Sequence, residues 1–280
     1  MTVEHRLRIG AREVLLVEGP AGWGECSPLA GYPCDPARAR AAALEAATLG
    51  WPAPRRAVVP VNAFLAADAP IEPAALAGFP AIKVKVGRSA PDVDVRRLRA
   101  LRNAVGPGPA IRIDANGAWD VPTAIEVLRA VEPLHLEFVE QPVTSIDDLA
   151  EVRRRAAVPI AADECVRSVD DARRVRALGA ADLVVLKVQP LGGVRPALEV
   201  AAAAGLPAVV SSMLETSVGL AAGVALAAAL EELPFACGLA TLGEVAGDVT
   251  DEPLVPVDGA LPVRPVVPSA AALAAYGARS

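Results

Sequence analysis

Residues 81–117 begin with the apolar run AIKVKVG at 81–87 and end with IRIDANG at 111–117. Between them, 91–105 has apolar residues at the spacing of a helix: Val93, Val95, Leu98, Leu101 and Val105. A run rich in Val and Ile, then a helix, then a second such run is the pattern of one β-α-β unit in a parallel sheet. This stretch therefore predicts an α/β fold.

The same alternation recurs from about residue 58 to residue 243. We expect strands at 59–65, 81–86, 111–114, 136–140, 160–163, 183–187, 208–211 and 235–238. We expect helices at 91–105, 121–131, 146–155, 169–178, 195–204 and 218–230. Eight strands that alternate with helices predict a (β/α)8 TIM-type barrel.

The two ends of the chain lack this rhythm. Pro52, Pro54 and Pro60 flank a linker after the first 57 residues, and a Pro- and Val-rich tail follows residue 243. We expect a small α+β capping domain, with 1–57 as its N-terminal part and 244–280 as a tail that packs back on it. The barrel, 58–243, then carries the catalytic residues.

Composition limits the partners. The 280 residues carry 27 Lys and Arg against 33 Asp and Glu, a net charge of −6, and aromatic residues make up only 3%. An acidic chain with few rings to stack on bases predicts no nucleic-acid partner. The apolar run at 218–230 is shorter than the roughly 18 residues of a membrane span, and the charged N-terminus lacks a secretory pattern. We expect a cytoplasmic monomer or small homo-oligomer with reduced cysteines.

Ionisable residues end five consecutive predicted strands: Lys85, Asp114, Glu140, Asp163 and Lys187. Each follows the previous one by about one βα unit, so all five should meet at the rim where barrel active sites are built. Alternation along a strand also places Lys83 on the same face as Lys85, and Arg112 on the same face as Asp114.

Three carboxylates that converge would repel one another unless a cation lies between them. Oxygen ligands without His or Cys suit Mg²⁺, with Mn²⁺ as an alternative, better than zinc. The only histidines are His5 and His135, and His135 lies at the start of the fourth run, the wrong end of the barrel for catalysis. A Ser-His-Asp hydrolase is therefore disfavoured.

Several motifs then resemble one family. The segments IKVKVG (82–87), RIDANGAW (112–119), EFVEQP (137–142), ADE (162–164) and LKVQPLGG (186–193) are similar to barrel motifs of the enolase superfamily. GWGECSPL (22–29) resembles the cap of its muconate-lactonizing-like subgroup, and SSMLETSVGL (211–220) its seventh-strand loop. The Arg112-x-Asp114 pattern, the short cap and LVPVDG (254–259) are most similar to the subgroup's dehydratases of menaquinone biosynthesis.

The resemblance implies roles for the rim residues. Asp114, Glu140 and Asp163 would bind the metal, Lys85 would be the acid/base, and Lys187 would lie across a small carboxylate substrate. The implied reaction is a Mg²⁺-dependent syn dehydration of 2-succinyl-6-hydroxy-2,4-cyclohexadiene-1-carboxylate to 2-succinylbenzoate through an ene-diolate. The expected substrate contacts are Lys83, Arg112, Asn116, Ser211, Ser212 and Gly238. Glu164 should point away from the site, because it follows Asp163 by one residue.

The sequence leaves two alternatives open. Two opposed lysines also permit an N-acylamino-acid racemase or a related muconate-cycloisomerase-like enzyme, in which Lys85 and Lys187 exchange a proton across two faces. A barrel kept only as a silent binding module is the non-enzymatic alternative. The three rim carboxylates and both lysines argue against that module.

Overall fold

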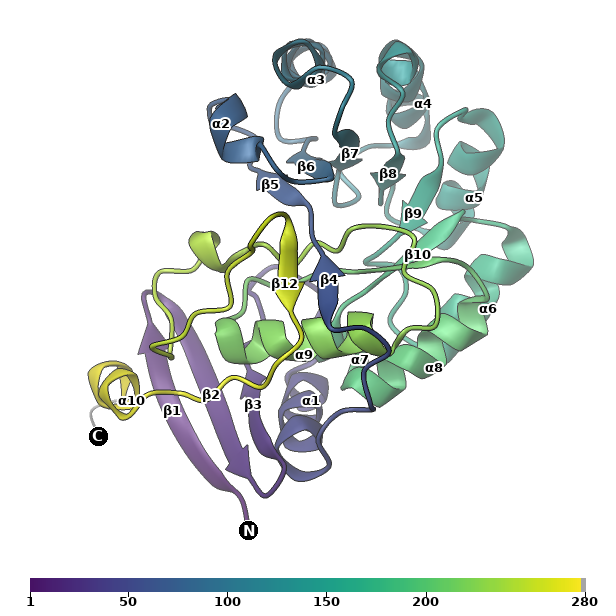
Figure 1. Ribbon diagram of the computed structural model, residues 1–280. Coiled ribbons are helices and arrows are strands. Elements are labelled where there is room, and N and C mark those ends of the chain that lie inside the picture. Colours follow the sequence, from purple (N-terminus) through teal and green to yellow (C-terminus); the bar gives the residue numbers. More distant parts are fainter. Residues whose placement is uncertain (278–280) are drawn as a thin grey trace.

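A curled parallel sheet forms the centre of the computed structural model, which describes residues 1–277 (Figure 1). Its seven strands lie side by side in chain order. They are β5 (Ala63–Leu65), β6 (Ala81–Lys85), β7 (Ala110–Asp114), β8 (Phe138–Glu140), β9 (Ile160–Ala162), β10 (Leu183–Leu186) and β11 (Ala208–Val210). The expected strand rhythm is therefore confirmed for these seven.

The eighth predicted strand, 235–238, forms bridges instead of a ladder. Cys237 pairs with Val61 and Gly238 with Ser211, so this segment joins the two edges of the sheet and closes the ring. The first predicted strand, 59–65, is divided. Its first half is β4 (Val58–Pro60), which pairs with β12 (Ala260–Pro262) of the tail, and only β5 enters the barrel.

Helices cover the outside of the sheet. They are α2 (Pro73–Leu76), α3 (Pro91–Val105), α4 (Val121–Val131), α5 (Ile146–Arg155), α6 (Val169–Leu178), α7 (Val188–Leu191), α8 (Val194–Ala204) and α9 (Ser217–Ala229), with 3-10 turns at Glu132–Leu134 and Leu242–Glu244. Asp120, Ser145 and Ser168 begin three of them as N-caps, each accepting a backbone N–H. Such caps satisfy donors that have no partner inside the helix, which explains why these boundaries follow the sequence closely.

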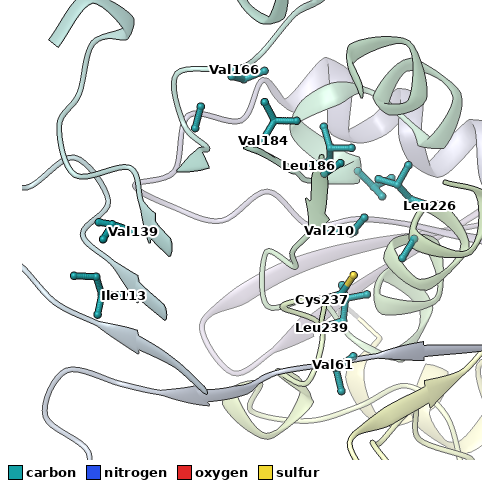
Figure 2. Close-up of a cluster of buried hydrophobic side chains, with 14 of the residues drawn as sticks. Val61, Ile113, Val139, Val166, Val184, Leu186, Val210, Leu226, Cys237 and Leu239 are labelled. Carbon is teal, nitrogen blue, oxygen red and sulfur yellow. The ribbon is translucent and has the colours of Figure 1, made fainter. Parts of the chain in front are cut away.

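Side chains alternate between the two faces of the sheet. Val184 and Leu186 of β10 belong to the large cluster that packs against the helices, together with Ile113 and Val139 (Figure 2). Leu183 and Val185 of the same strand belong to a separate cluster with Phe138. The second cluster fills the barrel interior, and the charged rim residues lie above it on the same face.

The cap is an antiparallel sheet of β1 (Val3–Ile9), β2 (Arg12–Gly19) and β3 (Gly22–Cys26), covered by α1 (Pro36–Thr48). Gly24 permits this close packing, because a Cβ there would lie 2.1 Å from the carbonyl oxygen of Ala43. In the described part of the tail, α10 (Ala270–Tyr276) contacts β1 (Figure 1). No helix within 1–277 is long and apolar enough to cross a membrane.

A buried polar network joins the cap to the barrel. Glu25 of β3 accepts hydrogen bonds from the backbone N–H of Gly219 at 2.9 Å and from the hydroxyl groups of Ser27 and Thr216 at 2.5 Å each. Gln189, two residues after Lys187, accepts a hydrogen bond from the backbone N–H of Ser27 at 2.8 Å. These contacts fix the cap over the mouth of the barrel.

Candidate active site

The five charged residues expected at the rim lie together at the C-terminal ends of the strands. Lys85, Asp114 and Glu140 are the last residues of β6, β7 and β8, while Asp163 and Lys187 directly follow β9 and β10. The sheet register sets Lys85 opposite Asp114 and Asp114 opposite Glu140. Alternation turns Lys85, Asp114 and Glu140 into the barrel mouth, and Asp163 and Lys187 form an ion pair there.

Lys83 lies below Lys85 and connects two of the carboxylates. Its ammonium group donates hydrogen bonds to Asp114 Oδ2 at 3.0 Å and to both oxygens of Glu140 at 3.0 and 3.1 Å. All three residues are buried, with exposed fractions between 0 and 6%. Buried charges of opposite sign offset the cost of removing each from water.

The titration of these groups reflects their crowding. Burial, together with the neighbouring charge of Asp114, raises the pKa of Glu140 to about 8. Burial also acts to raise the pKa of Asp114, but the ammonium groups of Lys83 and Lys85 lower it below its ordinary value. Burial raises the pKa of Asp163 despite the adjacent Lys187. Repelling carboxylates of this kind are stabilised by a bound cation.

The donor chemistry of the three carboxylates fits a hard divalent ion. Asp114, Glu140 and Asp163 supply oxygen only, which Mg²⁺ prefers. Within 1–277, no three His, Cys, Asp or Glu side chains are arranged as a ready set of metal ligands. Lys83 lies between Asp114 and Glu140, and Asp163 pairs with Lys187. Metal binding would therefore require the carboxylates to exchange some of their lysine contacts.

The two lysines at the mouth differ in their surroundings. Lys85 is 21% exposed, and its ammonium group donates to Asp114 Oδ2 at 2.6 Å and to Asn116 Oδ1 at 2.7 Å. Lys187 is 8% exposed and pairs with Asp163. The ring of Tyr32, from the cap, lies 4.2 Å from Lys187 Nζ, and its hydroxyl donates to Asp163 Oδ1 at 2.9 Å.

A cavity of about 900 Å³ opens above these residues. Both lysines line it, as do five of the six expected substrate contacts: Lys83, Asn116, Ser211, Ser212 and Gly238. The cap contributes the loop 29–33, which includes Tyr32. Gly238 allows Ser211 to approach closely, because a Cβ there would lie 2.7 Å from Ser211 Oγ. The cavity has the size of a small-molecule site.

Arg112 does not reach this cavity, so its expected contact with substrate needs correction. It lies on the inner face of β7, two residues before Asp114 and therefore one layer deeper in the barrel. It is 1% exposed, and its guanidinium group bonds with Asn62, Glu137 and the carbonyl oxygen of Ala236. Arg112 holds the barrel floor together.

Glu164 lies at the cavity, contrary to the expectation that it points away. Strand β9 ends at Ala162, and a turn with a hydrogen bond from Val166 N–H to Asp163 O follows. Strand alternation no longer applies there. Tyr32 was also missed, because it belongs to a cap loop without periodic pattern. The clue to it was only that the chain has two tyrosines and that one follows the GWGECSPL motif.

Known proteins resemble both parts of the chain. A family model for the enolase C-terminal domain-like fold matches residues 67–268, and one for the enolase N-terminal domain-like fold matches residues 1–47. An o-succinylbenzoate synthase of Thermobifida fusca is 59% identical over 92% of this chain and 83% of its own. One from Mycolicibacterium smegmatis is 48% identical over 96% and 85%. The crystal structure of muconate cycloisomerase from Pseudomonas fluorescens superposes with a TM-score of 0.86 at 22% identity, covering 100% and 98%.

Proposed function

The chain belongs to the enolase superfamily, and we propose that it acts as an o-succinylbenzoate synthase, a carbon–oxygen lyase of menaquinone biosynthesis. The observation that carries this proposal is the pair of lysines that face one cavity from opposite sides, with three buried carboxylates between them. High identity to o-succinylbenzoate synthases over most of the chain supports it.

The proposed substrate is 2-succinyl-6-hydroxy-2,4-cyclohexadiene-1-carboxylate. The bond from C1 to its hydrogen and the bond from C6 to its hydroxyl both break, the released electron pair completes an aromatic ring, and one water leaves. A single group on one face can take the proton and later return it to the departing hydroxyl. That sequence gives 2-succinylbenzoate by syn elimination.

Lys85 is the proposed acid/base. It is the most exposed of the three lysines that line the cavity, and its nitrogen is oriented by Asp114 and Asn116. A base must lie within hydrogen-bond reach of the proton that it removes, and Lys85 lines the cavity in which the substrate would bind. Neutral Lys85 takes the proton from C1, and its ammonium form protonates the leaving hydroxyl.

Asp114, Glu140 and Asp163 are the proposed ligands of Mg²⁺, with Mn²⁺ as an alternative, because enzymes of this superfamily pair a Lys or His base with Mg²⁺. When bound, Mg²⁺ would supply positive charge to offset the negative charge that develops on the substrate carboxylate. Lys83 adds a further buried positive charge below that position. The polar residues Ser211 and Ser212 and the backbone of Gly238 would bind the succinyl carboxylate.

Lys187 is proposed as a fixed positive charge across the substrate. Its contacts with Asp163 and with the face of Tyr32 restrain it, so that it stabilises a planar anion by charge and by cation–π contact. A racemase would instead need Lys187 to transfer a proton. The asymmetry between the lysines therefore favours dehydration over a two-base exchange.

Ultraviolet absorbance, which follows loss of the diene, tests the proposal. The purified protein with Mg²⁺ should convert the cyclohexadiene substrate, EDTA should stop the reaction, and added Mg²⁺ should restore it. Asp163→Ala should raise the Mg²⁺ concentration needed for half-maximal rate by at least about tenfold. Racemisation of N-acylamino acids without dehydration would replace this proposal by the racemase, and an unchanged Mg²⁺ titration would remove Asp163 from the ligand set.

A further inference from the structure

We propose that Glu164 is a positioning residue for Lys85 and acts through the side-chain amide of Asn116. The three side chains form one chain of hydrogen bonds. Lys85 Nζ donates to Asn116 Oδ1 at 2.7 Å, and Asn116 Nδ2 donates to Glu164 Oε1 at 2.7 Å. The inference rests on the proposed role of Lys85 as the base.

The chemistry of the three groups fixes which of them donates and which accepts in each of these hydrogen bonds. A lysine ammonium group only donates hydrogen bonds, an ionised carboxylate only accepts them, and an amide has one accepting and one donating end. Glu164 therefore selects which end of Asn116 faces Lys85. Without an acceptor at position 164, the amide can turn and present its own N–H groups to the ammonium group of Lys85.

The backbone around both residues is fixed by Gln141. Asn116 has a left-handed φ of 47°, which Asn tolerates better than most residues. The next residue, Gly117, donates its N–H to the carbonyl oxygen of Gln141 at 2.7 Å. The side-chain oxygen of the same Gln141 accepts the N–H of Asp163 at 2.8 Å. Because one buried residue holds both turns, the distance between Asn116 and Glu164 is set by the barrel.

Glu164 has a second feature that points to function. Its Oε2 atom is buried and has no hydrogen-bond partner in the described part of the chain. A buried carboxylate oxygen without a partner lowers stability. A buried polar atom that lacks a hydrogen-bond partner at a cavity wall is typical of a functional site.

Four variants test the hydrogen-bond relay from Lys85 through Asn116 to Glu164. Glu164→Ala removes the acceptor, so kcat should fall at least about tenfold with KM within about threefold. Glu164→Gln keeps an accepting oxygen and should stay within about threefold of wild-type kcat. Asn116→Asp opposes two carboxylates and should lower kcat by at least about 30-fold. In the double variant with Glu164→Gln and Asn116→Asp, the amide at position 164 can donate to the carboxylate at position 116. Its kcat should be at least about tenfold higher than that of Asn116→Asp alone.

Rescue in the double variant is the decisive result, since a residue with a merely structural role would give additive losses. A double variant no more active than Asn116→Asp, or a Glu164→Ala protein with wild-type kcat, would overturn the proposal. The midpoint of Mg²⁺ activation should stay the same in Glu164→Ala, which separates Lys85 from the neighbouring ligand Asp163. Glu126→Ala, on the exposed face of α4, is the matched control and should be unaffected.

A crystal structure separates this proposal from the proposed function. If the wild-type protein does not dehydrate the substrate, the proposed function fails. Crystal structures of the Glu164 variants still test whether Glu164 positions Asn116 and Lys85. In Glu164→Ala the contact between Lys85 Nζ and Asn116 Oδ1 should be lost, and in Glu164→Gln it should remain. An unchanged 2.7 Å contact in Glu164→Ala would refute the positioning role.

Discussion

The two sides of the active-site mouth are built differently. On one side, Lys85 donates hydrogen bonds to two barrel residues, Asp114 and Asn116, and keeps 21% of its side chain exposed. On the other side, Lys187 is 8% exposed and lies between Asp163 of the barrel and Tyr32 of the cap. The hydrogen-bond acceptors of Lys85 therefore come from the barrel, whereas Lys187 is held by groups from both domains.

This difference fits two separate roles for the two lysines, proton transfer for Lys85 and charge stabilisation for Lys187. A group that carries a proton to and from a substrate needs access to the cavity and a nitrogen held within hydrogen-bond reach of that substrate. A group that stabilises charge works best when its position is fixed in advance. The barrel supplies the first, and docking of the cap supplies the second.

Lys85→Ala should have the largest effect. Removing the only proposed proton carrier should lower kcat by at least about 10³-fold, while circular dichroism and Mg²⁺ binding remain those of the wild type. The absorbance assay gives the rate, and calorimetric titration gives the metal affinity. Appreciable turnover by this variant would transfer the role of base to another residue and end the proposed division between the two lysines.

The barrel side of the site was largely predictable from the sequence. Alternation along short strands fixes which face Lys85, Asp114 and Glu140 occupy, and the βα repeat returns each to the same rim. Alternation also has limits. It gives the face of Arg112 but not its depth, and it ceases at Ala162, so that it misplaced Glu164.

The cap side was not predictable in this way. Tyr32 lies in a loop whose path depends on how the cap docks on the barrel, and no local periodicity encodes that contact. The network around Glu25 is similar, because Gly219 and Thr216 lie nearly two hundred residues away along the chain. Contacts between domains depend on tertiary packing, which a pattern within one segment cannot express.

Glu25 gives the second prediction, which concerns how firmly the cap is held. Burial raises the pKa of Glu25 from 4.5 to about 7, against the lowering effect of its hydroxyl donors Ser27 and Thr216. As pH rises from 4.5 to 7, the unfolded chain loses this proton while the folded protein keeps it. The wild-type free energy of unfolding should therefore fall, relative to Glu25→Gln, by about 3 kcal/mol over this range, at about 1.4 kcal/mol per pKa unit.

Urea unfolding at several pH values measures this change. The pH-independent effect of placing an amide among hydrogen-bond donors cancels, because only the variation of the difference with pH is used. Glu13→Gln, whose parent side chain is 84% exposed, should show no such variation. If the difference in free energy of unfolding between wild type and Glu25→Gln does not change with pH, Glu25 has the same pKa in the folded and unfolded states. Its burial between cap and barrel would then not disfavour its charged form.

Substitutions of Tyr32 should have the smallest effect, and they test directly whether the cap matters for the Lys187 side of the mouth. Tyr32→Phe keeps the ring 4.2 Å from Lys187 Nζ but loses the hydroxyl bond to Asp163, whereas Tyr32→Leu loses both. A cation–π contact shielded from water contributes about 1 to 2 kcal/mol. Tyr32→Leu should therefore lower kcat/KM about tenfold, and Tyr32→Phe by about threefold or less. Equal losses in both variants would assign the role of Tyr32 to its hydroxyl and Asp163. No loss in either would show that the barrel alone positions Lys187, and the contrast between the two sides of the mouth would then have no functional consequence.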